Sequence, residues 1–342
     1  MQKAKEQRVA SAFSTRLALP SKGPMYDGSV AFLEACGLRV TRSNPRRYTA
    51  TIRALPGVEV LLHRPADIVE KVADGEIEIG ISGMDLVEEL RGDRDDLLVI
   101  YDDLGFSRAE LVIAIPETWI DVTAWGDLAD LALELHAQGR PLRIATKYPA
   151  LIRRFCATQG INRYRLIDSQ GATEAAPGLG YADIIADITE TGTTLRENQL
   201  KILGGPILRS QACLIAHRRS LTEHAEVRSL VRTLLEHVEA RQRARSYMQV
   251  TANIPGESIE DVGRRVTARR ELAGLQGPTI APLWNSSPDD TQHWFMVTIV
   301  VPYERMLALV DHLRLLGGAG MAVVQVQYVF AEQSEAFARL GI

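Results

Sequence analysis

The chain has 342 residues, of which 46% are apolar and 24% are charged, and its formal net charge is −4 at pH 7. This length suits two or three domains, each with enough apolar residues for a core. The small negative net charge gives no general basic field, so we expect no nucleic-acid partner. No apolar run reaches about 18 residues, which predicts no membrane span. The polar start of the chain lacks the apolar stretch of a signal peptide.

The three cysteines, Cys36, Cys156 and Cys213, are far apart and odd in number. They form no CxxC pair and no cluster with histidine, so the sequence predicts neither a disulfide framework nor a zinc site. We therefore expect a reducing, cytoplasmic location.

Short apolar strands alternate with helices in the first part of the chain. Strands are predicted at 17–20, 58–62, 77–82 and 111–115, and helices at 29–35, 66–73 and 86–90. Residues 79–82 are continuously apolar, which is typical of a strand buried on both faces. This alternation indicates βαβ units around a parallel sheet.

A second series of the same kind follows. Its predicted elements are a helix at 125–138, a strand at 142–145, a helix at 150–158, and strands at 165–167 and 182–188. Residues 213–217 then read as the closing strand of the first series. This order predicts that the second α/β unit is inserted into the first.

The last third of the chain has a different pattern. Ser220-Leu221-Thr222-Glu223 reads as a capping box that opens a long helix ending near Arg245. The predicted elements after it are a strand at 248–253, a helix at 258–268, strands at 279–283 and 294–301, a helix at 303–316 and a strand at 322–329. This βαββαβ order is typical of a ferredoxin-like domain.

The segment 174–195, EAAPGLGYADIIADITETGTTL, carries the clearest functional signal. A strand ending at Asp187 leads into a loop of threonine and glycine, and a helix starts near Leu195. Glycine lets successive backbone N–H groups point into one pocket, threonine hydroxyls add donors, and a helix N-terminus adds a positive dipole. Such a loop suits a phosphate monoester, and the acid suits ribose hydroxyls. An ordinary strand–helix turn is the plain alternative, but the full pattern is more specific than a bare TGxT.

This pattern resembles the phosphoribosyl-binding signature of the ATP phosphoribosyltransferase family, which begins histidine biosynthesis. The matching positions are Glu174, Gly180, Ala182, Ile185, Asp187, Thr191, Gly192, Thr194 and Leu195. The resemblance implies that Asp187 is catalytic and binds the ribose of 5-phosphoribosyl 1-diphosphate (PRPP). The implied PRPP-binding set is Glu174, Asp187, Thr189, Glu190, Thr191, Gly192, Thr193 and Thr194.

The resemblance covers residues from about 16 to 330 and implies two α/β lobes like those of periplasmic ligand-binding proteins, with the active site between them. Lys22 lies in a loop that matches the family's first loop, and it is implied to be catalytic by contacting the diphosphate. Pro24 stands where the family often has arginine. The residues implied to line the nucleotide side of the cleft are Ser21, Gly23, Arg64, Asp67, Gly83 and Asp85.

The implied reaction is attack by N1 of ATP on C1 of PRPP, giving phosphoribosyl-ATP and diphosphate. N1 has a free lone pair, so no strong general base is required. Mg²⁺ is expected to arrive on the diphosphate, with no metal held by the protein alone. Two alternatives are a phosphoribosyltransferase with another base acceptor and a non-catalytic two-lobed binding protein. The phosphoribosyl pattern argues against the second.

The C-terminal domain resembles the ACT-like regulatory domain of the family's long form, above all at residues 278–283. This implies L-histidine as effector, bound near Thr251, Leu275 and Thr279. It also implies a homo-oligomer, dimer or hexamer, without a separate regulatory subunit. The expected divisions are a flexible extension at 1–14, a first lobe at 15–115 with 200–220, a second lobe at 116–199, a linker helix at 221–246, the regulatory domain at 247–332 and a tail at 333–342.

Overall fold

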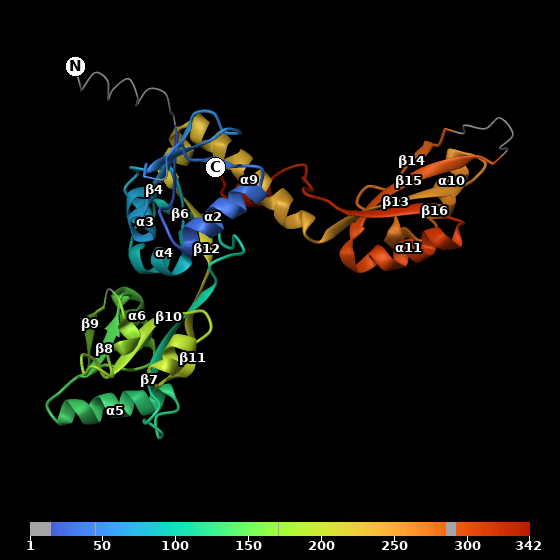
Figure 1. Cartoon of the computed structure of the whole chain (residues 1–342). Helices are drawn as coiled ribbons and strands as arrows, with labels where there is room; N and C mark the ends of the chain where they lie inside the picture. The colour runs from blue at the N-terminus through green and yellow to red at the C-terminus, as the bar shows by residue number, and fades with distance from the viewer. Residues whose placement is uncertain (1–14, 45, 170, 285–291) are drawn as a thin grey trace, which may run out of the picture. The chain divides into compact units, whose positions relative to one another are not determined.

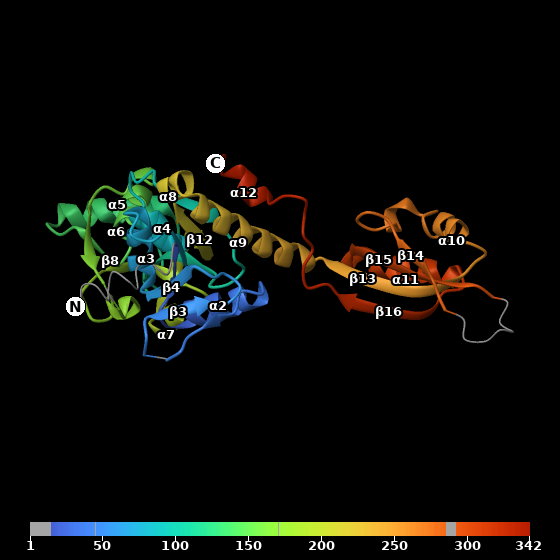
Figure 2. The ribbon, with the colours of Figure 1, turned by 90° about the horizontal axis from the view of Figure 1, so that it is seen from above.

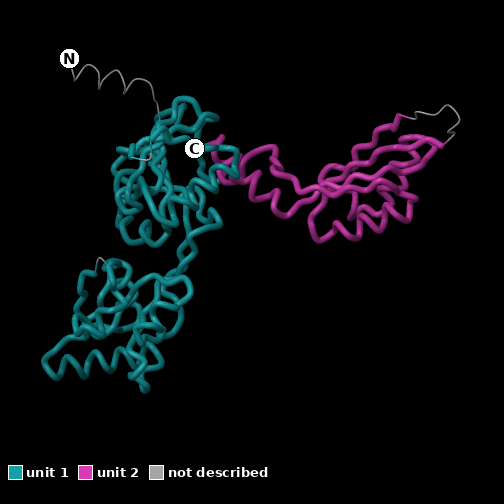
Figure 3. Tube along the Cα trace, in the orientation of Figure 1, with its two compact units in different colours: residues 1–231, 339–342 teal, residues 232–338 magenta. Residues whose placement is uncertain are grey.

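A computed structural model describes residues 15–44, 46–169, 171–284 and 292–342 (Figure 1). The expected extension at 1–14 lies outside these ranges. Contacts divide the chain into two compact units, residues 1–231 with 339–342 and residues 232–338 (Figure 3). Within the described ranges, no helix combines the length and apolar character needed to cross a membrane.

The first sheet has seven strands in the order β2-β3-β4-β1-β5-β12-β6. They are β1 (Thr15–Pro20), β2 (Val40–Thr41), β3 (Thr49–Ile52), β4 (Val58–His63), β5 (Ile79–Gly83), β6 (Leu97–Tyr101) and β12 (Ala212–His217). The helices of this lobe are α2 (Pro24–Ala35), α3 (Pro65–Ala73) and α4 (Met84–Leu90). β1 lies parallel to both β4 and β5, and β5 is buried along its whole length, as its apolar run predicted.

The second sheet has five strands in the order β11-β7-β10-β8-β9. They are β7 (Ala109–Pro116), β8 (Leu142–Thr146), β9 (Tyr164–Asp168), β10 (Ile184–Thr189) and β11 (Leu200–Ser210), with helices α5 (Trp125–Ala137), α6 (Pro149–Thr158) and α7 (Thr193–Glu197). β12 then returns to the first sheet between β5 and β6, antiparallel to both. The prediction that the second unit is inserted into the first is therefore confirmed.

Sheet membership differs from the expected limits of the two lobes. Residues 109–115 and 200–210 were assigned to the first lobe, but β7 and β11 pair with each other in the second sheet, and β7 also pairs with β10. The sequence did not predict β11 because Gly204-Gly205-Pro206 interrupts its apolar pattern, and its register with β7 shifts at this point.

The predicted capping box at Ser220 is wrong. Ser220 lies inside a short helix, α8 (Arg218–Glu223), and a separate helix, α9 (Ala225–Ala244), follows. The cap of α8 is His217, whose Nδ1 accepts a hydrogen bond from the backbone N–H of Ser220 at 3.3 Å. The Ser220 hydroxyl also contacts this ring nitrogen, at 2.9 Å, so it is not free to cap a helix of its own.

The C-terminal unit contains a four-stranded antiparallel sheet in the order β14-β15-β13-β16 (Figure 2). Its elements are β13 (Tyr247–Pro255), α10 (Ile259–Val266), β14 (Thr279–Pro282), β15 (Trp294–Pro302), α11 (Met306–Leu315) and β16 (Ala319–Gln325), with α12 (Glu335–Arg339) in the expected tail. Alternate residues of β13 and β15 pack against α10 and α11 in one core. This topology confirms the predicted ferredoxin-like βαββαβ domain and, with the two sheets above, the predicted fold class.

Candidate functional site

A cavity of about 360 Å³ lies where β10 ends and α7 begins. The residues that line it are Glu174, Ile185, Asp187, Ile188, Thr189, Glu190, Thr191, Thr193, Thr194 and Leu195. The structure thus brings together every residue of the predicted PRPP-binding set except Gly192, which lies in the same loop as the N-cap of α7. We refer to this cavity as the phosphoribosyl cavity.

Hydrogen bonds within the loop fix its shape. The Thr189 hydroxyl accepts from the backbone N–H of Gly192 at 2.9 Å, and the hydroxyls of Thr191 and Thr193 lie 3.0 Å apart. Gly192 has φ 70°, in the left-handed region. A Cβ there would meet only Ile202 Cδ1, at 4.0 Å, so the backbone conformation requires glycine and crowding does not. Since α7 has only five residues, the hydroxyl and N–H groups of the loop are its main potential donors to an anion, more than a helix dipole.

Asp187 faces this cavity with a side chain that is 18% exposed. Its Oδ1 accepts from the backbone N–H of Ile188 at 2.8 Å and lies 3.4 Å from Lys147 Nζ. Sequence reasoning missed Lys147, although it directly follows β8, the parallel neighbour of β10. Glu174 reaches the cavity from a separate short turn, residues 173–175.

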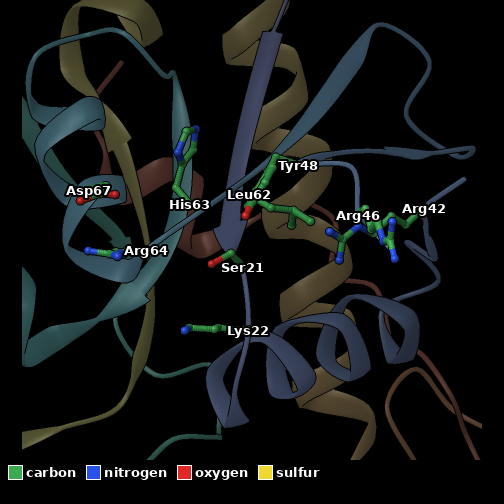
Figure 4. A pocket seen from close by; sticks show the side chains of 9 residues that line it. All are labelled: Ser21, Lys22, Arg42, Arg46, Tyr48, Leu62, His63, Arg64 and Asp67. Atoms are coloured by element: carbon green, nitrogen blue, oxygen red, sulfur yellow. The ribbon is translucent and has the colours of Figure 1, made fainter. Parts of the chain in front are cut away.

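A second cavity, of about 580 Å³, belongs to the first lobe (Figure 4). It is lined by Ser21, Lys22, Arg42, Arg46, Tyr48, Leu62, His63, Arg64 and Asp67. Figure 4 shows Arg42 and Arg46 on one side of Ser21, and Arg64 with Asp67 on the other. Four cationic side chains face a single carboxylate here, which suits a ligand with several phosphates. We refer to it as the cationic cavity.

The cationic cavity gathers four predicted residues, Ser21, Lys22, Arg64 and Asp67, and adds five that the sequence analysis did not assign to a site. The added ones are Arg42, Arg46, Tyr48, Leu62 and His63. The basic stretch at 42–47 was the signal that could have found the two arginines. Burial and the nearby charge of Lys71 lower the pKa of His63, so this imidazole is neutral near pH 7.

Gly23 precedes α2 with φ 77°, and a Cβ there would meet nothing within 4 Å. As at Gly192, the positive φ favours glycine. The residue therefore sets the direction in which the chain leaves the Lys22 loop and enters the helix.

Gly83 and Asp85 differ from the other predicted cleft residues because both are buried. Asp85 is 6% exposed; its Oδ2 accepts from the Tyr148 hydroxyl at 2.5 Å and its Oδ1 from the Ser210 hydroxyl at 2.7 Å. A Cβ on Gly83 would lie 2.3 Å from Asp85 Oδ1, so close packing requires glycine there. Asp85 thus binds protein groups through both oxygens, and it joins the first lobe to Tyr148 of the second. Burial and the charge of Asp85 raise the pKa of Tyr148 well above its ordinary value, which keeps its hydroxyl a donor.

The predicted effector residues lie in the C-terminal sheet. Thr251 on β13 and Thr279 on β14 both pair with Thr298 on β15, so the three side chains form a row across the strands. Their neighbours Ala252, Val297 and Ile280 belong to the core beneath the helices, which places the threonine row on the opposite face. Leu275 is 49% exposed, and its backbone N–H donates to the carbonyl of Val300, two residues along β15, at 3.1 Å.

Comparison with known proteins agrees with this architecture. The family described as "ATP phosphoribosyltransferase" matches residues 64–239, and "HisG, C-terminal domain" matches residues 244–328. The ATP phosphoribosyltransferase of Nitrobacter winogradskyi is 36% identical over 329 residues, which cover 95% of this chain and 97% of that protein. ATP phosphoribosyltransferase 2, chloroplastic, of Arabidopsis thaliana is 39% identical over 329 residues, covering 95% of this chain and 79% of that protein. A solved ATP phosphoribosyl transferase (HisG:HisZ) complex from Thermotoga maritima is 27% identical, covers 66% of this chain and 98% of its own, and has a TM-score of 0.49.

Proposed function

Since this chain belongs to the ATP phosphoribosyltransferase family of histidine biosynthesis, we propose that it transfers the phosphoribosyl group of PRPP to N1 of ATP. The products are phosphoribosyl-ATP and diphosphate. The observation that carries the proposal is the phosphoribosyl cavity, because it sets one carboxylate, Asp187, beside a loop of hydroxyl and N–H donors. A ribose 5-phosphate presents two hydroxyls and a phosphate monoester, which match these two groups.

In this proposal each part of the phosphoribosyl cavity has one task. Asp187 accepts hydrogen bonds from the ribose hydroxyls. The hydroxyls of Thr191, Thr193 and Thr194, with the backbone N–H groups of the loop, hold the 5-phosphate. Holding the sugar at both ends fixes the position of C1 for an attacking nitrogen.

In this proposal the cationic cavity binds the diphosphate that leaves PRPP or the triphosphate of the incoming ATP. Lys22 and Arg64 balance the charge of the departing diphosphate or of the ATP triphosphate, and Arg42 and Arg46 extend the same positive surface. As the C1–O bond to diphosphate breaks, the ribose becomes cationic and the leaving group gains negative charge. N1 of adenine uses its own lone pair to form the new bond, so alignment and charge stabilisation supply the catalysis.

Mg²⁺ fits this arrangement as an ion shared with the substrate. Glu174, Asp187 and Glu190 give the phosphoribosyl cavity oxygen donors of the kind that Mg²⁺ prefers, and it binds through few carboxylates together with phosphate oxygens. Among the described residues, no three His, Cys, Asp or Glu side chains gather as a metal-binding group. The ion would reduce the charge repulsion between diphosphate and these acids.

For regulation, we assign L-histidine to the threonine row of the C-terminal sheet, near Thr251, Leu275 and Thr279. Because this domain lies in the same chain, we propose that the enzyme needs no separate regulatory subunit. We also propose that it is a homo-oligomer, dimer or hexamer. We assign it to the cytoplasm, in keeping with Cys36, Cys156 and Cys213, which are buried free thiols.

The test is direct. The protein is incubated with ATP, PRPP and Mg²⁺ in the presence of a diphosphatase, and phosphoribosyl-ATP is quantified by mass spectrometry. Asp187→Asn is expected to raise the KM for PRPP, by roughly tenfold or more for a lost charged hydrogen bond, whereas Asp130→Asn on the exposed side of α5 is the control. Consumption of PRPP with another base, but not with ATP, would instead support the alternative acceptor.

A further inference from the structure

Lys147 lies beside Asp187 because of strand register. β8 and β10 are parallel neighbours, and Thr146 pairs with Ala186. Lys147 directly follows β8, and Asp187 directly follows Ala186 within β10, so the two residues lie side by side next to the phosphoribosyl cavity. Lys147 Nζ lies 3.4 Å from Asp187 Oδ1, with side chains 36% and 18% exposed.

The contacts of Asp187 orient its carboxylate. Oδ1 faces both Lys147 Nζ and the backbone N–H of Ile188, at 3.4 and 2.8 Å. One N–H donor and one ammonium beside the same oxygen restrict rotation of the carboxylate and leave Oδ2 better placed to accept from a ligand hydroxyl. Without the lysine, the Ile188 N–H alone would hold this orientation.

The position of Lys147 is itself fixed by its neighbour Tyr148. The ammonium lies 5.2 Å from the centre of the Tyr148 ring, within the range of a cation–π contact. Tyr148 is 1% exposed; its backbone N–H donates to Thr146 Oγ1 at 3.0 Å and its hydroxyl to Asp85. Lys147, the residue between Thr146 and Tyr148, therefore has little freedom to move.

Two carboxylates of α4, in the first lobe, hold the segment that carries Lys147. Asp85 binds the Tyr148 hydroxyl, and it is held in turn by Ser210. Glu89 accepts from the backbone N–H groups of Ala150 and Leu151 at 2.8 and 2.9 Å. A series of contacts thus runs from α4 to Asp187: a hydrogen bond from Tyr148 to Asp85, a cation–π contact between Tyr148 and Lys147, and an ion pair between Lys147 and Asp187.

We infer that Lys147 is a positioning residue for the phosphoribosyl-binding carboxylate: it orients Asp187 toward the ribose hydroxyls and is held for this by Tyr148 and Asp85. The inference rests on the proposed function, because it takes Asp187 as the ribose acceptor. It adds a residue that lies outside the 174–195 segment and on a different strand.

The experiment measures PRPP binding by calorimetry and steady-state kinetics in the full chain. Lys147→Met keeps an unbranched side chain of similar length but removes the charge, and it should weaken PRPP binding and raise the KM for PRPP by roughly three- to tenfold, as for a partly exposed ion pair. kcat at saturating PRPP should change by less than about twofold, because only binding of the ribose is affected. Lys147→Arg should restore binding. Lys201→Met is the matched control, since Lys201 Nζ of the same sheet donates to the Trp119 carbonyl at 2.7 Å.

A double-mutant cycle with Asp187→Asn shows whether the lysine acts through the aspartate. Lys147→Met should have little further effect on PRPP binding in the Asp187→Asn background. A full effect in that background would overturn the inference, because Lys147 would then act on the ligand directly. Wild-type binding by Lys147→Met would also overturn it. Failure of the proposed function is distinguishable, since it would appear as a wild-type enzyme that binds PRPP but forms no phosphoribosyl-ATP.

Discussion

At the scale of single residues, backbone conformation constrains the residue at position 192, in the loop of the phosphoribosyl cavity, more than side-chain size does. Glycine was expected in this loop because it lets successive backbone N–H groups point into one pocket. The structure agrees with this conformational reason, since a Cβ at Gly192 would have open space around it but the backbone has φ 70°. The loop therefore depends on glycine even where the smallest side chain would fit.

Gly192→Ala tests this distinction. Forcing alanine into the left-handed region costs about 1–2 kcal/mol, so the loop should shift and the Thr189–Gly192 hydrogen bond should be lost. We expect PRPP affinity, measured by calorimetry, to fall by roughly tenfold. Gly126→Ala, at an open position of α5 without positive φ, should bind as wild type. Equal affinity in both variants would show that the loop tolerates a side chain at 192.

Asp183 ties the start of β10 to β8. Its Oδ1 accepts from Arg140 at 2.8 Å and Arg143 at 3.0 Å, and its Oδ2 accepts from the backbone N–H of Arg143 at 2.8 Å. Burial alone would raise the pKa of Asp183, but the hydrogen bonds from Arg143 and Arg140 outweigh it, so the pKa is lowered. Because this pKa lies below the unfolded value of about 3.9, the contacts of the Asp183 carboxylate with Arg140 and Arg143 stabilise the fold at pH values above about 3.9. This stability is lost as pH falls through the folded pKa.

Asp183→Asn should therefore lower the free energy of unfolding at pH 7 by about 1–3 kcal/mol, since a buried hydrogen-bonded charge is removed. It should also flatten the decline of stability below about pH 4. Urea unfolding at pH 7 and at pH 3.5 measures both effects, with Asp130→Asn as the control. A variant whose stability falls with acid as steeply as that of wild type would contradict the assignment.

At the scale of elements, the link between α4 and α6 is the most testable. Tyr148→Phe removes one hydroxyl without changing the packed ring, but it leaves the buried Asp85 without one of its donors. We expect a loss of about 1–3 kcal/mol in the free energy of unfolding. Tyr164→Phe on β9 is the matched control. If both variants unfold at the same urea concentration as wild type, the Asp85 contact does not stabilise the fold.

The sequence predicted the positions of helices and strands more readily than which strands pair in a sheet. Apolar runs and helix periodicity located β1, β4, β5 and β8, and the βαββαβ order located the C-terminal domain. The membership of β7 and β11 depends on hydrogen bonds between segments about 90 residues apart, which a local pattern does not contain. The capping box failed for a related reason, because His217 competes for Ser220.

The same limit applies to the candidate site. Residues 187–194 are contiguous, so one segment predicted most of the phosphoribosyl cavity. Lys147 reaches Asp187 from the end of another strand, and Arg42 and Arg46 line the cationic cavity from a loop. Only the folded structure brings them there. The sequence could not distinguish the buried Asp85 from the partly exposed Asp67, because both are acids in the first turn of a helix that follows a strand.

At the scale of the whole molecule, one domain of the chain must act on another if histidine inhibits. Allostery requires a coupling free energy between two sites, typically about 1–3 kcal/mol, and the effect is reciprocal. L-Histidine should therefore inhibit without competing for the adenine or phosphate contacts. PRPP should weaken histidine binding by the same factor by which histidine weakens PRPP binding, as measured by calorimetry of each ligand with and without the other.

The threonine row provides the variant that separates regulation from catalysis. The Thr251 hydroxyl donates to the Ala322 carbonyl at 3.3 Å and faces away from the core, so Thr251→Val removes a polar contact while keeping the shape of the strand. We expect the histidine concentration for half-inhibition to rise by roughly tenfold, with kcat and both KM values unchanged when histidine is absent. Thr267→Val is the control, because the hydroxyl of Thr267, which caps the C-terminal end of α10, donates to Gly263 O at 2.7 Å. Equal inhibition of both variants would place the effector elsewhere, and absence of histidine binding at millimolar concentration would leave the domain a role in assembly alone.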